Sequence, residues 1–146
     1  METLVKTLEE LETEATRFIE TLVPQKDRAT LVTLSGDLGA GKTAFTKAVA
    51  HTFGVEEVVT SPTFVLEKIY QLRGPTSKFE RLIHIDAYRL ESGKDLAPLG
   101  FDELMQDSGN LILLEWPEKV QDELPTPSQR ISLTALSGGS RTISYG

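Results

Sequence analysis

Cysteine is absent from this chain of 146 residues, and histidine occurs only twice. The lack of cysteine excludes disulfide bonds, thiol catalysis and cysteine-type zinc sites, and two histidines are too few for a multi-histidine metal site. No apolar run approaches the roughly 18 residues of a membrane-spanning helix, so we expect no membrane association. The N-terminus lacks the basic start and apolar core of a signal peptide, and we therefore expect a cytoplasmic protein.

Basic residues are scarcer than acidic ones: 15 Lys and Arg stand against 22 Asp and Glu, which gives a formal net charge of −7. Because a protein this acidic repels a phosphate backbone, we predict that the isolated chain does not bind nucleic acid directly. Hydrophobic residues make up 39% of the chain and charged residues 25%, an ordinary balance for a globular protein. The length suits a single domain over residues 1–146.

Helical and strand patterns alternate in the first part of the chain. Thr7 followed by Glu10 fits a capping box, and apolar residues at helical spacing predict a helix that continues from there towards Pro24. A β-type run, a glycine-rich segment and an amphipathic stretch then predict a strand, a loop and a second helix. Their ranges are 31–34, 36–41 and 42–53, with Gly54 as the cap of the second helix.

The second part of the chain is mainly strand-like. Residues 64–70 and 79–85 are rich in β-branched and apolar side chains, and the short turn between them makes them antiparallel neighbours. Residues 92–106 suggest two short helical pieces interrupted by Pro98 and Gly100. Further predicted elements are a strand buried on both faces at 111–114, a short helix from Pro117, and a hairpin of strands 129–135 and 141–145. Together these patterns predict an α/β fold of three layers with a mixed parallel and antiparallel sheet, in which the strand before the loop is central.

The glycine-rich segment points directly to a chemistry. Residues 36–43 read Gly-Asp-Leu-Gly-Ala-Gly-Lys-Thr and fit the phosphate-loop pattern G-x-x-x-x-G-K-[ST] completely. Glycines let consecutive backbone N–H groups point at phosphate oxygens, and the following helix adds its positive N-terminal end. We expect Lys42, at a solvent-facing helix start, to supply charge to the β- and γ-phosphates, and the Thr43 hydroxyl to ligate Mg²⁺. The candidate nucleotide-binding residues of this loop are Asp37, Leu38, Gly39, Ala40, Gly41, Lys42 and Thr43.

Two acids that end apolar runs are candidates for a magnesium site. Asp86 follows Leu-Ile-His-Ile, and Glu115 follows Leu-Ile-Leu-Leu. A phosphate-loop site places an acid at the end of a neighbouring buried strand beside Mg²⁺, and the pattern alone does not rank the two. Each acid could instead mark only the point where a strand leaves the core. We expect His84, inside the first run, to be a hydrogen-bonded core residue.

Three features near these acids have both a functional and a structural interpretation. Ser61-Pro62-Thr63-Phe64 could sense the γ-phosphate as switch loops do, or could be a turn that begins a strand. Arg89 is the only arginine that we expect to meet transition-state charge, although it could equally pair with a surface acid. Trp116 is the only tryptophan of the chain. A single tryptophan is usually core packing, but its position next to Glu115 favours a role at the nucleotide.

Four motifs, in this order along the chain, resemble those of one family. They are the loop at 36–43, Ser-Pro-Thr-Phe at 61–64, His-Ile-Asp-Ala-Tyr-Arg-Leu at 84–90 and Glu-Trp-Pro-Glu at 115–118. The combination resembles the bacterial TsaE family of tRNA threonylcarbamoyladenosine biosynthesis proteins, which are small P-loop ATPases. The resemblance extends from the N-terminal helix to the final hairpin. It implies an ATPase that drives the cycle of two partner proteins, TsaD and TsaB, which modify adenosine 37 of tRNA, so that tRNA would be met only through that complex.

The same resemblance implies ATP and Mg²⁺ as ligands and assigns roles to residues. It implies that Thr43 and Glu115 ligate Mg²⁺, that Asp86 lies close to the metal and the phosphates, and that Trp116 lies near the nucleotide. It further places Glu10 and Gly139 near the base or ribose. The candidate catalytic residues are therefore Lys42, Asp86 and Glu115, and the candidate metal ligands are Thr43, Asp86 and Glu115.

Two other functions stay open from the sequence. A small-molecule kinase needs an acceptor pocket and a lid that carries arginines, for which only residues 73–81 are available, and these read as a hairpin. A non-catalytic ATP-responsive binding module would use Glu115 to hold the metal, and turnover would be incidental. A GTPase is disfavoured because no Asn-Lys-x-Asp motif occurs.

Overall fold

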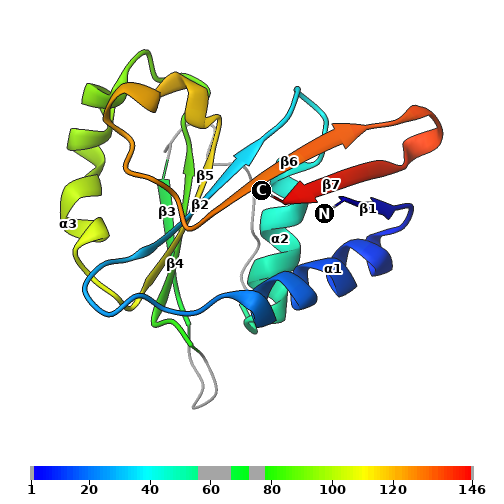
Figure 1. The fold of residues 1–146 in the computed structure, drawn as a ribbon, viewed down its shortest axis with the longest axis horizontal. Helices are drawn as coiled ribbons and strands as arrows, with labels where there is room; N and C mark the ends of the chain where they lie inside the picture. Colours follow the sequence, from blue (N-terminus) through cyan, green and yellow to red (C-terminus); the bar gives the residue numbers. More distant parts are fainter. Residues whose placement is uncertain (1, 56–66, 73–77, 146) are drawn as a thin grey trace.

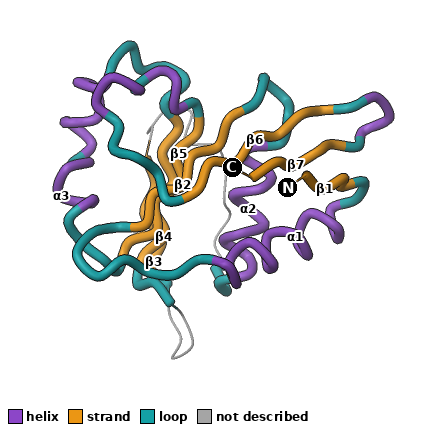
Figure 2. Tube along the Cα trace, viewed as in Figure 1, coloured by secondary structure: helices purple, strands orange, loops and turns teal. Residues whose placement is uncertain are grey.

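The computed structural model describes residues 2–55, 67–72 and 78–145. In these ranges the chain forms one seven-stranded sheet with helices on both faces (Figures 1 and 2). The strands are β1 (Glu2–Val5), β2 (Thr30–Ser35), β3 (Glu67–Gln71), β4 (Arg81–Asp86), β5 (Asn110–Glu115), β6 (Gln129–Ala135) and β7 (Arg141–Tyr145). Their order across the sheet is β1-β7-β6-β2-β5-β4-β3, so β2 lies at the centre.

The middle of the sheet is parallel and its margins are antiparallel. β2 pairs in parallel with β5 and with β6, and β5 pairs in parallel with β4. β3 is antiparallel to β4, and β7 is antiparallel to both β6 and β1. The predicted α/β fold with a mixed sheet is therefore confirmed, as is the antiparallel pairing of the two strands joined by a connection too short for a crossover helix.

The helices cover the two faces of the sheet and complete the three layers. α1 and α2 pack together on one face, whereas α3 and the three 3₁₀ segments between β4 and β6 lie on the other, and a fourth 3₁₀ segment forms the turn between β6 and β7 (Figure 1). The helices are α1 (Leu8–Thr21), α2 (Lys42–Thr52) and α3 (Phe101–Met105), and the 3₁₀ segments are Gly93–Leu99, Pro117–Lys119, Gln121–Glu123 and Ser137–Gly139.

Strand β5 shows why the central strands are apolar throughout. Leu111 and Leu113 join the apolar cluster under α1 and α2, whereas Ile112 and Leu114 join the cluster under α3. Successive side chains of a strand point to opposite faces, so a strand covered on both faces needs an unbroken apolar run. The run ends at Glu115, and the acid is thereby delivered to the end of a buried strand.

Helix α1 begins as predicted, with half of the expected capping box. The Thr7 side chain accepts a hydrogen bond from the Glu10 N–H at 3.1 Å. The Glu10 carboxylate does not return to the Thr7 backbone, however, but accepts from the Lys6 N–H at 2.5 Å. Thr7 thus satisfies one of the amides that a helix start leaves without a partner.

Two parts of the fold differ from the sequence prediction. β1 (Glu2–Val5) was not predicted, and it pairs with β7 alone at the margin of the sheet. Pro98 lies inside the 3₁₀ segment Gly93–Leu99 and does not interrupt it, so that part of the prediction was wrong. Gly100 separates this segment from α3, because its backbone takes the left-handed conformation with φ of 73°.

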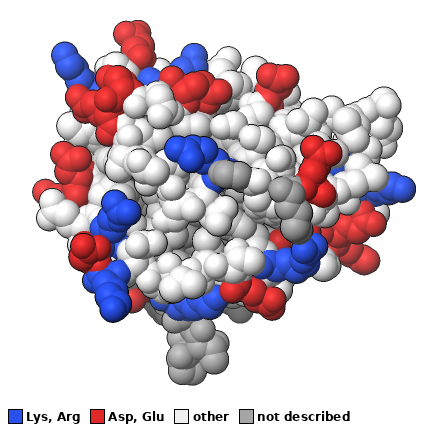
Figure 3. All heavy atoms as spheres, viewed as in Figure 1, with Lys and Arg blue, Asp and Glu red and all other residues white. Residues whose placement is uncertain are grey.

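The surface carries charges of both signs. On the face drawn in Figure 3, acidic and basic side chains are interspersed around a central area that is mostly uncharged. Among the helices of the described ranges, none has the length and apolar character required to cross a membrane.

Candidate nucleotide and magnesium site

The phosphate loop connects the end of β2 to the start of α2, in the middle of the sheet. Its first and last glycines, Gly36 and Gly41, have φ of 150° and 104°, where a side chain is strained. They also leave no room for one. A Cβ on Gly36 would lie 2.5 Å from the Leu133 carbonyl oxygen, and a Cβ on Gly41 would overlap the Arg141 guanidinium. The loop is therefore closely packed against the hairpin of β6 and β7.

Lys42, the first residue of α2, is buried and only 5% exposed. Its Nζ donates to the carbonyl oxygens of Gly36 at 2.5 Å and Asp37 at 2.9 Å, and it lies 4.2 Å from the centre of the Trp116 ring. The expectation of a solvent-facing lysine was wrong, because the loop folds back over the amine and the indole covers it. Burial lowers the pKa of Lys42, and nearby carboxylates, Glu115 foremost, oppose that shift.

Glu115 joins the loop to the sheet. Its side chain is almost fully buried, and its Oε2 accepts a hydrogen bond from Thr43 Oγ1 at 3.3 Å. The same oxygen lies 2.5 Å from Nε2 of His84, on the neighbouring strand β4. Within the described residues the buried Nδ1 of His84 has no hydrogen-bond partner. We therefore assign the ring proton to Nε2, which donates to Glu115, and His84 is confirmed as a hydrogen-bonded core residue.

Asp86 ends β4 directly beside Glu115. The two residues are partners in the parallel register of β4 and β5, and Asp86 Oδ1 accepts from the Tyr88 N–H at 3.0 Å. Two carboxylates and the Thr43 hydroxyl thus gather at one end of the sheet, and all are the oxygen ligands that Mg²⁺ prefers. In the part of the chain that the structure describes, no three His, Asp or Glu side chains converge to hold a metal on their own.

Trp116 follows Glu115 in an uncommon backbone conformation. With φ of 61° it is the only residue other than glycine with a positive φ in the described ranges. Its backbone N–H donates to the Leu34 carbonyl oxygen at 3.2 Å, and the centre of its indole ring lies 5.0 Å from the centre of the Tyr88 ring. This bond to the end of β2 holds the left-handed turn and directs the indole over Lys42. Conformations of this kind persist only where the surroundings enforce them, often at functional sites.

A cavity of about 210 Å³ lies between the start of α1 and the start of β7, and one of its lining residues, Arg141, also contacts the loop at Gly41. Its lining residues are Val5, Lys6, Thr7, Leu8, Leu11, Gly139 and Arg141. Gly139, predicted near the base or ribose, lines it directly. The Glu10 carboxylate accepts a hydrogen bond from the backbone N–H of Lys6, another lining residue. Residues far apart in the sequence are brought together here by the pairing of β1 with β7.

The other candidate residues are placed in different ways. Leu38, at the tip of the loop, is 70% exposed, whereas Ala40 is buried, and Arg89 is exposed in the turn after β4. Residues 61–64 and 73–77, considered as a switch loop and as part of a lid, lie outside the described residues. Arg141 was missed, because only the folded hairpin brings it against Gly41.

A family model described as threonylcarbamoyl adenosine biosynthesis protein TsaE matches residues 5–143. The chain belongs to the TsaE family. It is similar to the tRNA threonylcarbamoyladenosine biosynthesis protein TsaE of Treponema pallidum, with 39% identity over 117 residues, 80% of this chain and 82% of the relative. The protein of the same name from Rickettsia bellii is 37% identical over 141 residues, 96% of this chain and 90% of the relative.

A solved structure extends the TsaE family assignment to the fold. The crystal structure of Bacillus subtilis YdiB superposes with a TM-score of 0.74 at 28% identity, over 99% of this chain and 83% of that one. The family resemblance predicted from the four sequence motifs is thus confirmed.

Proposed function

We propose that this chain is the Mg²⁺-dependent, ATP-binding and ATP-hydrolysing component of the machinery that makes threonylcarbamoyladenosine at position 37 of tRNA, with TsaD and TsaB as partners. One observation carries the proposal. Thr43 Oγ1, at the start of α2, lies 3.3 Å from Glu115 Oε2. Glu115 ends β5, which pairs with β2, the strand that leads into the loop. A hydroxyl and a carboxylate in this position beside a phosphate loop form the protein side of a Mg²⁺–nucleotide site.

The donor set fits magnesium. Thr43, Glu115 and Asp86 offer only oxygen atoms, and Mg²⁺ is commonly held by one or two carboxylates together with substrate phosphates. When bound, the ion neutralises charge on the β- and γ-phosphates. The residues around it have separate tasks: Thr43 and Glu115 hold the ion, Lys42 supplies positive charge, and the first amides of α2, which have no acceptor within the helix, bind phosphate oxygens.

The charges around Lys42 give a reason for the metal dependence. Glu115, Asp86, Glu118 and Asp37 are all close enough to influence its pKa. Four carboxylates repel a polyphosphate, and a single lysine does not offset them. A divalent cation between the acids and the phosphates turns this repulsion into attraction.

The proposed dependence on partners follows from charge as well. The net charge of −7 makes tRNA a poor direct ligand, so tRNA is met through TsaD and TsaB. Arg89 is the only arginine that we expected to meet transition-state charge, and it is exposed in the turn after β4. Phosphoryl transfer is slow where no arginine stabilises the transition state, and an arginine supplied in trans can add 10³–10⁵ in rate. We therefore expect feeble hydrolysis by the chain alone and stimulation by the TsaD–TsaB pair.

Steady-state ATP hydrolysis tests this function directly. The full chain is measured with Mg²⁺ alone, with the TsaD–TsaB pair, with tRNA alone and with a panel of small hydroxyl acceptors. Stimulation by the pair is the expected result. Vigorous ATP turnover that the pair does not change would refute the proposal, as would strong stimulation by tRNA without the pair. Phosphate transfer to a small acceptor would favour a kinase.

A further inference from the structure

We propose that Arg141 binds the phosphate next to the ribose, the α-phosphate. This inference rests on the proposed function, since it names a further ligand of the same nucleotide. Its basis is the position of one guanidinium between the phosphate loop and the neighbouring cavity.

The hairpin contacts the phosphate loop at both ends. At the first glycine, Gly36, the backbone of Leu133 on β6 comes so close that no side chain fits. At the last glycine, Gly41, the Arg141 guanidinium occupies the space where a Cβ would stand. Arg141 is the first residue of β7, and its backbone is held on both sides by pairing with β1 and β6. The strand therefore anchors the side chain beside the loop.

Arg141 also lines the cavity of about 210 Å³, whereas Lys42, Thr43 and Glu115 do not. This cavity is smaller than the roughly 300–1,000 Å³ typical of sites for drug-sized ligands, so it suits part of a nucleotide, such as the ribose or the base. Arg141 is the residue that links the two places, since it lines the cavity and its guanidinium lies against Gly41 of the loop, so a ligand that fills the cavity and also reaches the loop comes close to it. A nucleoside phosphate has this shape, and the first group beyond its ribose is the α-phosphate.

The charge of Arg141 suits this role. Among the described residues its guanidinium has no hydrogen-bond or ion-pair partner, and its side chain is half-buried. A guanidinium binds phosphate through two parallel N–H donors and stays charged at any physiological pH. Lys42 and Thr43 lie on the side of Glu115 and serve the β- and γ-phosphates, which leaves the α-phosphate to Arg141.

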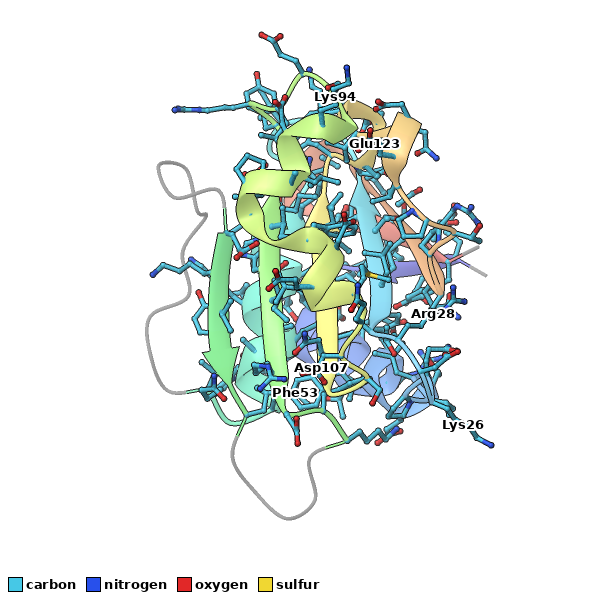
Figure 4. All side chains as sticks on the ribbon, turned by 90° about the vertical axis from the view of Figure 1, so that its left-hand side faces the viewer. Lys26, Arg28, Phe53, Lys94, Asp107 and Glu123 are labelled. Carbon is cyan, nitrogen blue, oxygen red and sulfur yellow. The ribbon has the colours of Figure 1, made fainter. Side chains whose placement is uncertain are left out.

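Binding of Mg–ADP to the full chain, followed by calorimetry, tests the proposal. The variants are Arg141→Met and Arg141→Gln, which remove the charge, and Arg141→Lys, which keeps it. Arg28→Met is the matched control, because Arg28 is exposed and lies at the opposite end of the sheet, before β2 begins (Figure 4). Melting without nucleotide shows whether the variants fold as the parent does.

We expect the Kd for Mg–ADP to rise about tenfold or more in Arg141→Met and Arg141→Gln, the usual effect of losing a charged hydrogen bond. Arg141→Lys should recover most of the affinity, and Arg28→Met should bind as the parent does. The melting temperatures should stay within about 4 °C of the parent. An unchanged Kd would overturn the proposal, as would equal losses in all three variants with lower melting temperatures, which would mean that Arg141 only supports the loop.

Replacement of one α-phosphate oxygen of ADP by sulfur tests which phosphate is bound. The ratio of the Kd values for this analogue and for ADP should differ between the parent and Arg141→Gln, and an identical ratio would refute the α-phosphate assignment. A parent chain that binds no Mg–ADP would overturn the proposed function as well. A parent that binds and hydrolyses normally, with variants that bind equally well, would overturn the role of Arg141 alone.

Discussion

His84 Nε2 lies 2.5 Å from Glu115 Oε2, and both side chains are almost completely buried. The histidine belongs to β4 and the glutamate to β5, so the orientation of the carboxylate is determined by the neighbouring strand. Thr43 Oγ1 donates to the same oxygen at 3.3 Å. His84 is therefore a positioning residue for the proposed magnesium ligand, and it acts through Glu115.

Substitution His84→Ala should raise the Mg²⁺ concentration needed for half-maximal ADP binding about tenfold, in the range seen when a hydrogen bond to a metal ligand is removed. ADP affinity measured in EDTA should change little. His51→Ala is the control, because His51 is exposed and pairs with the exposed Glu12, far from the phosphate loop in the sequence. Equal changes in EDTA and in Mg²⁺ would show that His84 supports the fold and not the carboxylate.

Substitution Lys42→Ala should weaken ATP binding at least tenfold, since it removes the positive charge of the phosphate loop. The protein should remain folded. The loss of contacts with the Gly36 and Asp37 carbonyls and with Trp116 is offset by the removal of a buried charge. Calorimetry and thermal melting measure the two effects, with the exposed Lys47→Ala on the same helix as control. Parent-like ATP affinity would show that the loop does not bind phosphate.

Substitution Glu115→Gln should reduce Mg²⁺-dependent hydrolysis about 100-fold or more, because the amide cannot replace the carboxylate as a ligand of a hard cation. Binding of ADP without metal should be unchanged or tighter, because one repulsive charge is gone. Glu103→Gln, an exposed acid of α3, serves as control. The hydrolysis rate is measured in the presence of the TsaD–TsaB pair, and the ADP affinity is measured in EDTA. Equal losses of rate and of affinity would make Glu115 a structural residue.

Substitution Tyr145→Phe should lower the free energy of unfolding by about 1–2 kcal/mol. The hydroxyl donates at 2.6 Å to Glu14, a carboxylate that is 4% exposed and otherwise pairs with Arg17. Burial and this hydrogen bond raise the pKa of Tyr145. Urea unfolding measures the change, and Tyr88→Phe, at an exposed position, should be nearly neutral. A Tyr145→Phe variant as stable as the parent would mean that the Glu14 carboxylate does not need this donor.

Substitution Glu67→Gln should make stability less dependent on pH. Burial raises the pKa of the Glu67 carboxyl above its usual value of 4.5, and within the described residues its Oε2 is buried without a hydrogen-bond partner. A raised carboxyl pKa favours the folded state at low pH, and this advantage is lost as the pH rises from the unfolded value through the folded one.

The Glu67→Gln variant should therefore exceed the parent in stability by about 0.5–1 kcal/mol at pH 7, since the group is only partly buried. The two proteins should converge as the pH falls well below the usual value of 4.5, where the carboxyl is protonated in both states. Urea unfolding across this range checks the prediction. A difference that does not vary with pH would exclude titration of Glu67 as its cause.

Local signals in the sequence predicted much of this fold. The Thr7 cap, the run of β5 and the turn before β7 each depend on a few adjacent residues. The phosphate loop was identified from its glycine and lysine spacing, and Asp86 and Glu115 became candidates because each stands where an apolar strand ends. β1 was missed because its four residues carry little strand signal and are stabilised by pairing with β7.

The contacts between distant residues could not be predicted in this way. The pairing of His84 with Glu115 depends on the register between β4 and β5, which neither strand encodes alone. The approach of Arg141 to Gly41 depends on how the last hairpin packs against the loop. Burial of Lys42 depends on the left-handed turn at Trp116, and the sequence offers no glycine there to signal it.

The position of Trp116 against Lys42 gives the protein an intrinsic optical signal. The chain has a single tryptophan, so its fluorescence reports one place only. That indole contacts the amine of the phosphate loop and the ring of Tyr88, and a nearby ammonium alters indole emission. Any event that moves the lysine or the turn after Glu115 should therefore change the emission spectrum, and its kinetics can be followed by stopped flow without an attached dye.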